Sequence, residues 1–166
     1  MMTASTDDLR IQKTNELIAP EQLIGEIGVS ERAAQTVSDA RSTIHRILCG
    51  EDDRLLAVVG PCSIHDPDAA REYGRRLKAA ADAVAGHGFV VMRVYFEKPR
   101  TSVGWKGLIN DPQLDGTCDI TDGLHKARRI LLRINEIGVP AATEFLETIT
   151  PQYVADLVSW SCIGAR

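Results

Sequence analysis

The chain lacks a Cys-x-x-Cys pair and a long apolar run. Four cysteines are widely separated: Cys49, Cys62, Cys118 and Cys162. This spacing does not support a zinc knuckle or a thioredoxin-type site, and it does not indicate a disulfide framework. No segment approaches the ~20 apolar residues of a membrane span, and residues 1–16 lack the apolar core of a signal peptide. We therefore expect a cytoplasmic protein without a membrane partner.

A surplus of basic charge is also missing. The formal net charge is −4 at pH 7, so bulk attraction to nucleic acid or to an anionic membrane is not expected. The 166 residues can form one domain with a sizeable core. A complete (β/α)₈ barrel needs about 250 residues, so this chain cannot form a whole barrel.

Strand-like and helix-like segments alternate from Leu55 onward. Apolar runs predict strands at 55–59, 89–94, 139–145 and from 161 onward. Helices are expected from Pro67 to just before Gly86, from Thr121 or Asp122 to Ile137, and from Pro151 to Val158. The first of these should bury a stripe formed by Tyr73, Leu77, Ala80, Ala81 and Val84. Because each crossover contains a helix, the strands should be parallel. This pattern fits half of a barrel and equally an open, doubly wound sheet.

The N-terminal region has a different character. Residues 1–29 read as an irregular arm, because Pro20 and the glycines at 25 and 28 interrupt any long helix. Ser30 can cap a helix through Leu48, with Gly50 at its end.

Reactive and charged residues follow the first two strands. Gly60-Pro61-Cys62 ends the first strand, and Arg93, Lys98 and Arg100 end the second. Parallel barrels carry their active sites at this edge, and Lys and Arg hold phosphate and carboxylate oxygens. The cluster therefore predicts an anion site, with a solvated basic loop as the alternative. Arg93 interrupts an apolar run, so its charge needs a partner.

Two further residues are candidates for chemistry. Cys62 can act as a nucleophile, as a metal ligand or as a structural thiol. Glu144, in the third strand, reads either as a functional carboxylate or as the partner of a nearby cation. The loop from 97 to 121 is long enough to be functional.

Four motifs carry a resemblance to one enzyme family. They are GPCSIHDP at 60–67, MRVYFEKPRT at 92–101, VGWKGLINDP at 103–112 and SCIGAR at 161–166. Together they resemble the class I synthases of 3-deoxy-D-arabino-heptulosonate 7-phosphate (DAHP), of the phenylalanine- or tyrosine-sensitive type. The resemblance implies an α/β fold, namely the first half of a (β/α)₈ TIM barrel with an N-terminal extension (arm plus helix). Residues 1–50 would form a regulatory or oligomerisation region, and residues 51–166 the first four β units.

The resemblance also implies a reaction. Phosphoenolpyruvate condenses with erythrose 4-phosphate to give DAHP and phosphate, the first step of the shikimate pathway. Arg93 and Lys98 match catalytic residues that bind phosphoenolpyruvate. Further residues that match its binding site are Glu144, Gly164, Ala165 and Arg166. The residues matching the erythrose 4-phosphate site are Pro99, Arg100 and Thr101. Cys62 matches one ligand of a divalent metal (Mn, Fe, Co or Zn), whose other ligands lie in later strands, so we expect this chain not to hold the metal properly and to be inactive alone.

An effector site is implied as well. The segment Asp7-Asp8-Leu9-Arg10-Ile11 resembles the arm of the phenylalanine-inhibited type, in a homo-oligomer. The matching effector-binding residues are Asp7, Asp8, Thr148, Pro151 and Gln152. Thr148 departs from that type, which usually has a larger apolar residue there. Phenylalanine is the first expected effector and tyrosine the second.

Two other classes of protein remain open: a non-catalytic phosphate- or metabolite-binding half barrel, and an assembly module that pairs with a complementary half. A different phosphoenolpyruvate-condensing synthase fits the motifs less well. In a half barrel we expect an open edge at the fourth strand. The expected exposed apolar residues are Leu56, Val58, Val91 and Ile163.

Overall fold

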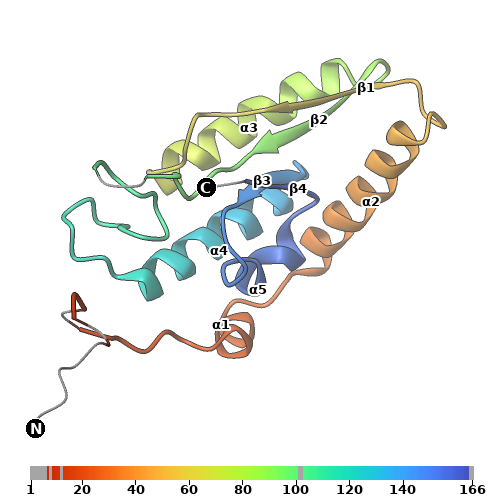
Figure 1. Cartoon of the computed structure of the whole chain (residues 1–166). Coiled ribbons are helices and arrows are strands. Elements are labelled where there is room, and N and C mark those ends of the chain that lie inside the picture. Colours follow the sequence, from red (N-terminus) through yellow and green to blue (C-terminus); the bar gives the residue numbers. More distant parts are fainter. Residues whose placement is uncertain (1–6, 8, 12, 101–102, 165–166) are drawn as a thin grey trace, which may run out of the picture.

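Four parallel strands form the centre of the molecule. The computed structural model describes residues 7, 9–11, 13–100 and 103–164. The strands are β1 (Leu55–Val59), β2 (Gly88–Arg93), β3 (Ala141–Phe145) and β4 (Trp160–Ile163), and they lie side by side in this order. Every neighbouring pair is parallel (Figure 1). A doubly wound sheet would reverse its strand order at a switch point. The sequential order instead gives the expected half barrel.

Helices in the crossovers cover one face of this sheet. They are α3 (Pro67–Ala83), α4 (Ile120–Glu136) and the short α5 (Pro151–Val154), which continues as a 3₁₀ turn, η1 (Ala155–Leu157). Asp66 caps α3 by accepting from the backbone N–H of Asp68 at 2.8 Å and of Ala69 at 3.2 Å. Asp119 caps α4 in the same way. The predicted start at Asp66-Pro67 is confirmed, whereas α4 begins at Ile120, slightly before the expected Thr121 or Asp122.

The buried face of α3 differs from the expected stripe. Tyr73, Ala80 and Val84 are exposed, whereas Ala70 and Gly74 are buried. A Cβ at position 74 would lie only 3.7 Å from the sulfur of Met92. The helix therefore approaches the sheet through small residues, a contact that a search for large apolar side chains does not detect.

The N-terminal region is more regular than expected. Pro20–Glu26 forms a helix, α1, because proline is well tolerated in the first turn of a helix. Leu23 of this helix is fully buried. The prediction of an irregular arm over 1–29 was thus wrong for this segment.

Three side chains tie the region around α1 to the crossover helices, and we call these contacts the arm ties. The hydroxyl of Tyr153 donates to the carbonyl of Ile18 at 2.6 Å. Nε2 of His125 lies 2.8 Å from a carboxylate oxygen of Glu26. The guanidinium of Arg128 donates to the carbonyl of Ile27 at 2.7 Å.

The helix α2 (Glu31–Leu48) is capped by Ser30, as expected. The hydroxyl of Ser30 accepts a hydrogen bond from the N–H of Ala33. Ile44 of α2 packs against Val91 and Ala142 on the sheet. These two strand residues share one face, because Arg93, two residues beyond Val91, pairs with Ala142. Helices α3, α4 and α5 pack on the opposite face. We call the face of the sheet that carries Val91 and Ala142 the inner face, and α2 covers it where Ile44 packs.

The inner face and the sheet edges expose apolar groups. Val58 is 40 % exposed and Trp160 is 39 % exposed. Val91, expected to be exposed, is buried under α2. Ile163 is 91 % exposed, but it pairs with Phe145 and so lies on the opposite face. Within the described part of the chain, no helix combines the length and the apolar character that a membrane crossing requires.

Candidate anion-binding site at the strand ends

Arg93 closes the end of β2 and holds the end of β1. Its Nε lies 3.2 Å from the carbonyl oxygen of Pro61, and its Nη2 lies 3.0 Å from the same oxygen and 3.1 Å from that of Gly60. The backbone comes this close because residue 60 has no side chain: a Cβ there would lie 2.9 Å from the Cβ of Arg93. The partners expected for the charge of Arg93 are thus the backbone carbonyls at the end of the neighbouring strand, β1.

Lys98 makes the second contact between these strand ends. Its ammonium lies 3.0 Å from the sulfur of Cys62 and 2.9 Å from the carbonyl oxygen of the same residue. The hydrogen bond from Lys98 lowers the pKa of the Cys62 thiol, and the positive charges of Lys98, Arg93 and Arg100 act in the same direction. The Cys62 thiol therefore lies among cations at the strand ends.

The loop after β2 is folded back on itself, and this fold positions Lys98. The N–H of Lys98 donates to the carbonyl of Lys106 at 2.9 Å. Gly107 has a φ of 110° and lies directly against the backbone of Phe96 and Glu97, so only glycine fits at this crossing. Pro99 and Arg100 lie exposed at the tip. Thr101, expected beside them, lies outside the described residues.

Glu144 and Gly164 come together at the other two strand ends. A Cβ on Gly164 would collide with the carboxylate of Glu144, so the backbone of β4 passes directly beside this side chain. Glu144 pairs in register with Cys162. The remaining two residues expected here, Ala165 and Arg166, lie outside the described residues.

Two residues of this site were not anticipated from the sequence. The ring of Tyr95 lies under the guanidinium of Arg93, with 5.1 Å from Cζ to the ring centroid, and its hydroxyl lies 3.8 Å from the sulfur of Cys162. Burial raises the pKa of the Tyr95 hydroxyl, and the neighbouring Cys162 and Glu144 raise it further. The spacing Arg-x-Tyr at a strand end, which places both side chains on one face, was the available signal.

Three of the expected effector residues, Thr148, Pro151 and Gln152, lie on and just before α5. Thr148 accepts a hydrogen bond from the side chain of Gln152 at 3.2 Å, and Pro151 begins the helix. The adjoining residues Ile149, Thr150 and Tyr153 line a hollow of about 210 Å³, which Leu17 of the arm also lines. Asp7 is exposed, and Asp8 lies outside the described residues.

The described residues do not assemble a metal centre. No group of three or more His, Cys, Asp or Glu side chains within ranges 7, 9–11, 13–100 and 103–164 has the arrangement of a metal site. Cys62 is one suitable donor, and its sulfur faces an ammonium group. One sulfur ligand does not define the geometry of a divalent metal, so the described residues alone do not fit such a group.

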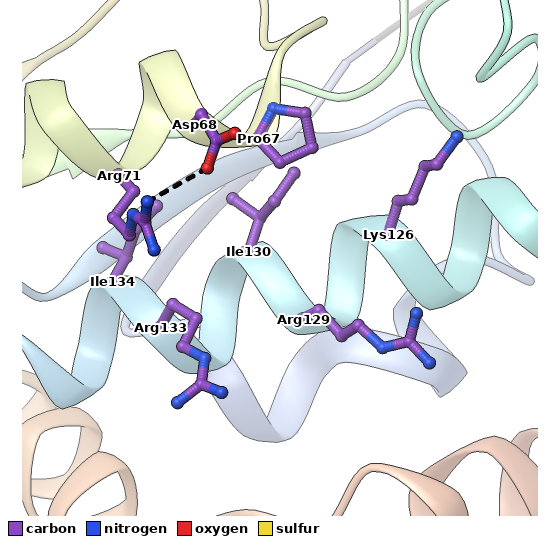
Figure 2. Close-up of a pocket in the computed structure, with 8 residues that line it drawn as sticks. All are labelled: Pro67, Asp68, Arg71, Lys126, Arg129, Ile130, Arg133 and Ile134. Atoms are coloured by element: carbon purple, nitrogen blue, oxygen red, sulfur yellow. Dashed lines mark ion pairs between the residues drawn. The ribbon is translucent and has the colours of Figure 1, made fainter.

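A separate groove lies on the outer side of the molecule, between α3 and α4. It has a volume of about 270 Å³, and Ile130, Ile134 and Pro67 are among its lining residues (Figure 2). Four basic residues line it, and one of them, Arg71, is paired with Asp68 at 3.1 Å. None of the strand-end residues described above lines it, and we assign it no role in anion binding.

Fold and site together define a parallel half barrel that gathers cations at the carboxyl ends of its strands. The sequence model of the DAHP synthetase I family matches residues 26–166. The chain therefore belongs to the DAHP synthetase I family, as its motifs predicted.

Individual relatives agree with this assignment. The chain is 58 % identical over 165 residues to a Phe-sensitive phospho-2-dehydro-3-deoxyheptonate aldolase of Escherichia coli (strain K12), covering 99 % of this chain and 47 % of the relative. It is 53 % identical over 161 residues to a Trp-sensitive counterpart of Salmonella typhi, covering 97 % and 46 %. A solved structure of the aldolase from Francisella tularensis SCHU S4 superposes with a TM-score of 0.91 at 50 % identity, covering 94 % of this chain and 46 % of that one. The chain thus spans about half the length of these relatives.

Proposed function

We propose that the strand-end site binds phosphoenolpyruvate as part of DAHP synthesis, an aldol-type condensation with erythrose 4-phosphate. The observation that carries the proposal is the convergence of Arg93 and Lys98 on the end of β1. Both cations are held by backbone carbonyls, so they are positioned before any ligand arrives. Positioned donors of this kind bind phosphate and carboxylate oxygens strongly.

The proposed division of the site follows the strand ends. Arg93, Lys98, Glu144 and Gly164 would hold phosphoenolpyruvate, with Ala165 and Arg166 as further proposed contacts. Arg100 and Pro99, at the exposed loop tip, would meet the phosphate of erythrose 4-phosphate together with Thr101. The arginine supplies a fixed fork of donors that suits a phosphate group.

Cys62 is the proposed contribution of this chain to a divalent metal (Mn, Fe, Co or Zn). When bound, such a metal polarises the aldehyde that is attacked. Because the described residues supply a single donor, we propose that this chain of 166 residues does not turn over substrates by itself.

Regulation by an aromatic amino acid is part of the proposal. The relatives named above include a Phe-sensitive enzyme at 58 % identity and a Trp-sensitive one at 53 %. This difference weakly favours phenylalanine, with tyrosine as the second choice. The proposed site comprises Asp7, Asp8, Thr148, Pro151 and Gln152, in a homo-oligomer in which residues 1–50 serve regulation or assembly.

A calorimetric titration with phosphoenolpyruvate tests the binding proposal. We expect the wild-type chain to bind and Arg93→Ala to lose tenfold or more in affinity, because a hydrogen bond to a charged group contributes about 1.5–3 kcal/mol and about 1.4 kcal/mol corresponds to a factor of ten. Arg129→Ala, which removes an exposed cation of α4, is the matched control and should bind like wild type. Equal affinities of wild type and Arg93→Ala would contradict the proposed site.

A second function remains open, that of a non-catalytic phosphate-binding or assembly module. Among the described residues no three His, Cys, Asp or Glu side chains are grouped as a metal site, which favours it. Both functions predict that this chain alone binds phosphoenolpyruvate without releasing phosphate from the two substrates in the presence of Mn²⁺. Turnover by this chain alone would refute the binding module and also the proposed inactivity of the chain.

A further inference from the structure

Arg93 is restrained in two ways, by backbone carbonyls and by the ring of Tyr95, and the second restraint has no assigned role. Its three hydrogen bonds to the carbonyls of Gly60 and Pro61 lie in the plane of the guanidinium, because all its N–H groups do. These bonds hold the Nε–Nη2 edge of the guanidinium and leave the group free to tilt about that edge. The ring of Tyr95, 5.1 Å from Cζ, covers one face of the guanidinium and opposes the tilt.

The ring of Tyr95 is itself held at its far end. Its hydroxyl lies 3.8 Å from the sulfur of Cys162 on β4, and the carbonyl of Tyr95 accepts from the N–H of Ile64 at 2.8 Å. Tyr95 is two residues beyond Arg93 on the same face, so its side chain reaches across β3 toward β4. One tyrosine thus connects the cation at the end of β2 with the fourth strand.

This arrangement leaves one edge of Arg93 for a ligand. Nε and Nη2 are engaged by the backbone, and Nη1 makes no hydrogen bond with the residues that the structure describes. A guanidinium presents five donors in a fixed fork, so the direction of the Nη1 edge is set by the plane and tilt of the whole group.

We propose that Tyr95 is a positioning residue for Arg93: its aromatic ring fixes the tilt of the guanidinium and thereby the direction in which Arg93 presents its open edge to an anion. The ring carries this role, and the contact of the hydroxyl with Cys162 is not required for it. The consequence for phosphoenolpyruvate rests on the proposed function, whereas the positioning of Arg93 does not.

The side-chain signal of Arg93 in NMR tests the positioning without any ligand. A guanidinium stacked on a ring has its Nε–H resonance displaced by the ring current, and Arg93→Lys identifies the signal by its loss. We expect the displaced signal in wild type and in Tyr95→Phe, and its return to the unstructured position in Tyr95→Leu. Tyr73→Leu, which removes an exposed tyrosine of α3, should leave the signal in place. A wild-type signal at the unstructured position, or no change in Tyr95→Leu, would overturn the proposal.

Binding of phosphoenolpyruvate provides the second readout. Loss of the cation–π contact should weaken binding about threefold to tenfold in Tyr95→Leu, while Tyr95→Phe stays within twofold of wild type. If Tyr95→Leu does not fold, Tyr95→Met keeps the bulk without the ring and should show the same loss. Equal affinities of Tyr95→Phe and the ringless variant would overturn the proposal. If no variant binds and the Arg93 signal still depends on the ring, the proposed function fails and the positioning role stands.

Discussion

The ammonium of Lys98 contacts two atoms of Cys62, the sulfur at 3.0 Å and the carbonyl oxygen at 2.9 Å. One cation from the segment after β2 therefore stabilises a thiolate and holds the end of β1 at the same time. Arg93 makes the equivalent contact one and two residues earlier, at Pro61 and Gly60. The geometry of the site depends on these two cations as much as its charge does.

Lys98→Met should raise the pKa of Cys62 toward its ordinary value of 9.0, because the largest cause of its depression is the hydrogen bond from Lys98. The thiolate is the reactive form, so alkylation by iodoacetamide near neutral pH should slow. Mass spectrometry of the peptide that carries Cys62 separates it from the other three exposed cysteines. Lys106→Met is the control. If the pH midpoint of Cys62 alkylation is the same in Lys98→Met as in wild type, Lys98 does not lower the pKa of Cys62.

Gly60→Ala should destabilise the chain, because the added Cβ would collide with the backbone oxygen of Arg93 and lie 2.9 Å from its Cβ. Overpacking of this kind costs about 1–3 kcal/mol, and urea unfolding measures it. Gly86→Ala is the matched control, since a Cβ there has no atom within 4 Å. A similar midpoint for both variants would show that β1 moves without cost.

Arg128→Met should cost about 3 kcal/mol of unfolding free energy, because it leaves a partly buried carboxylate and two carbonyls without a partner. The guanidinium is 0 % exposed and binds both carboxylate oxygens of Asp156 at 2.7 Å, together with the carbonyls of Ile27 and Tyr153. Arg129→Met changes the neighbouring exposed arginine and should stay within about 0.5 kcal/mol of wild type. Equal urea midpoints would contradict a structural role for Arg128.

The tie between His125 and Glu26 should make stability depend on pH. Burial lowers the pKa of His125, but its hydrogen bonds to Glu26 and to the carbonyl of Thr121 outweigh this, so the pKa lies above 6.5. The bond to His125 lowers the pKa of Glu26 below 4.5, helped by Gln22. The nearby Arg129 lowers both values.

The sign of the effect follows from these directions. A raised histidine pKa stabilises the fold below 6.5 and loses this contribution as the pH rises through the folded value. A lowered carboxyl pKa stabilises above 4.5 and loses its contribution on acidification. The tie is therefore strongest between these two values. The urea midpoint of wild type should fall toward that of His125→Gln as the pH rises above 6.5 and through the folded pKa of His125, whereas His45→Gln, on α2, should follow wild type. A constant gap between wild type and His125→Gln would refute this.

The open edge at β4 should make the isolated chain associate or remain loosely packed. Ile163 is 91 % exposed at an edge strand, and such edges template further pairing. Sedimentation velocity and near-UV circular dichroism measure both properties. Ile163→Lys should reduce association, because a charge on an edge strand opposes it, whereas Val84→Lys on α3 should not. A monodisperse wild-type monomer with sharp aromatic signals would prove the expectation wrong.

Much of the fold was readable from the sequence because local signals and burial agree. Apolar runs become strands, and Asp66-Pro67 caps its helix as its residue types predict. Other features depend on contacts between distant segments. The buried face of α3 includes Gly74, which lies beside Met92, Ile134 and Ile137, and α1 packs against α5, more than a hundred residues later in the chain.

The cations of the strand-end site could be predicted from the sequence, whereas the contacts that these cations make could not. Arg93 and Lys98 stand out as cations beside an apolar run, but their carbonyl partners at Gly60, Pro61 and Cys62 come from another strand. Tyr95 and Cys162 were missed because neither carries a charge, and because they lie at the ends of two strands, β2 and β4, that are separated by β3. Arg128 was missed because its buried partners lie in two other segments.

The arm ties have a consequence for synthesis on the ribosome. They join residues separated by 99, 101 and 135 positions in the chain, and contacts this distant are the last to form. Growing at about 5–20 residues per second, the nascent chain must keep the buried face of α1, including Leu23, in water for several seconds until Tyr153 emerges. Leu23, which is fully buried in the finished fold, is therefore open to water during that time.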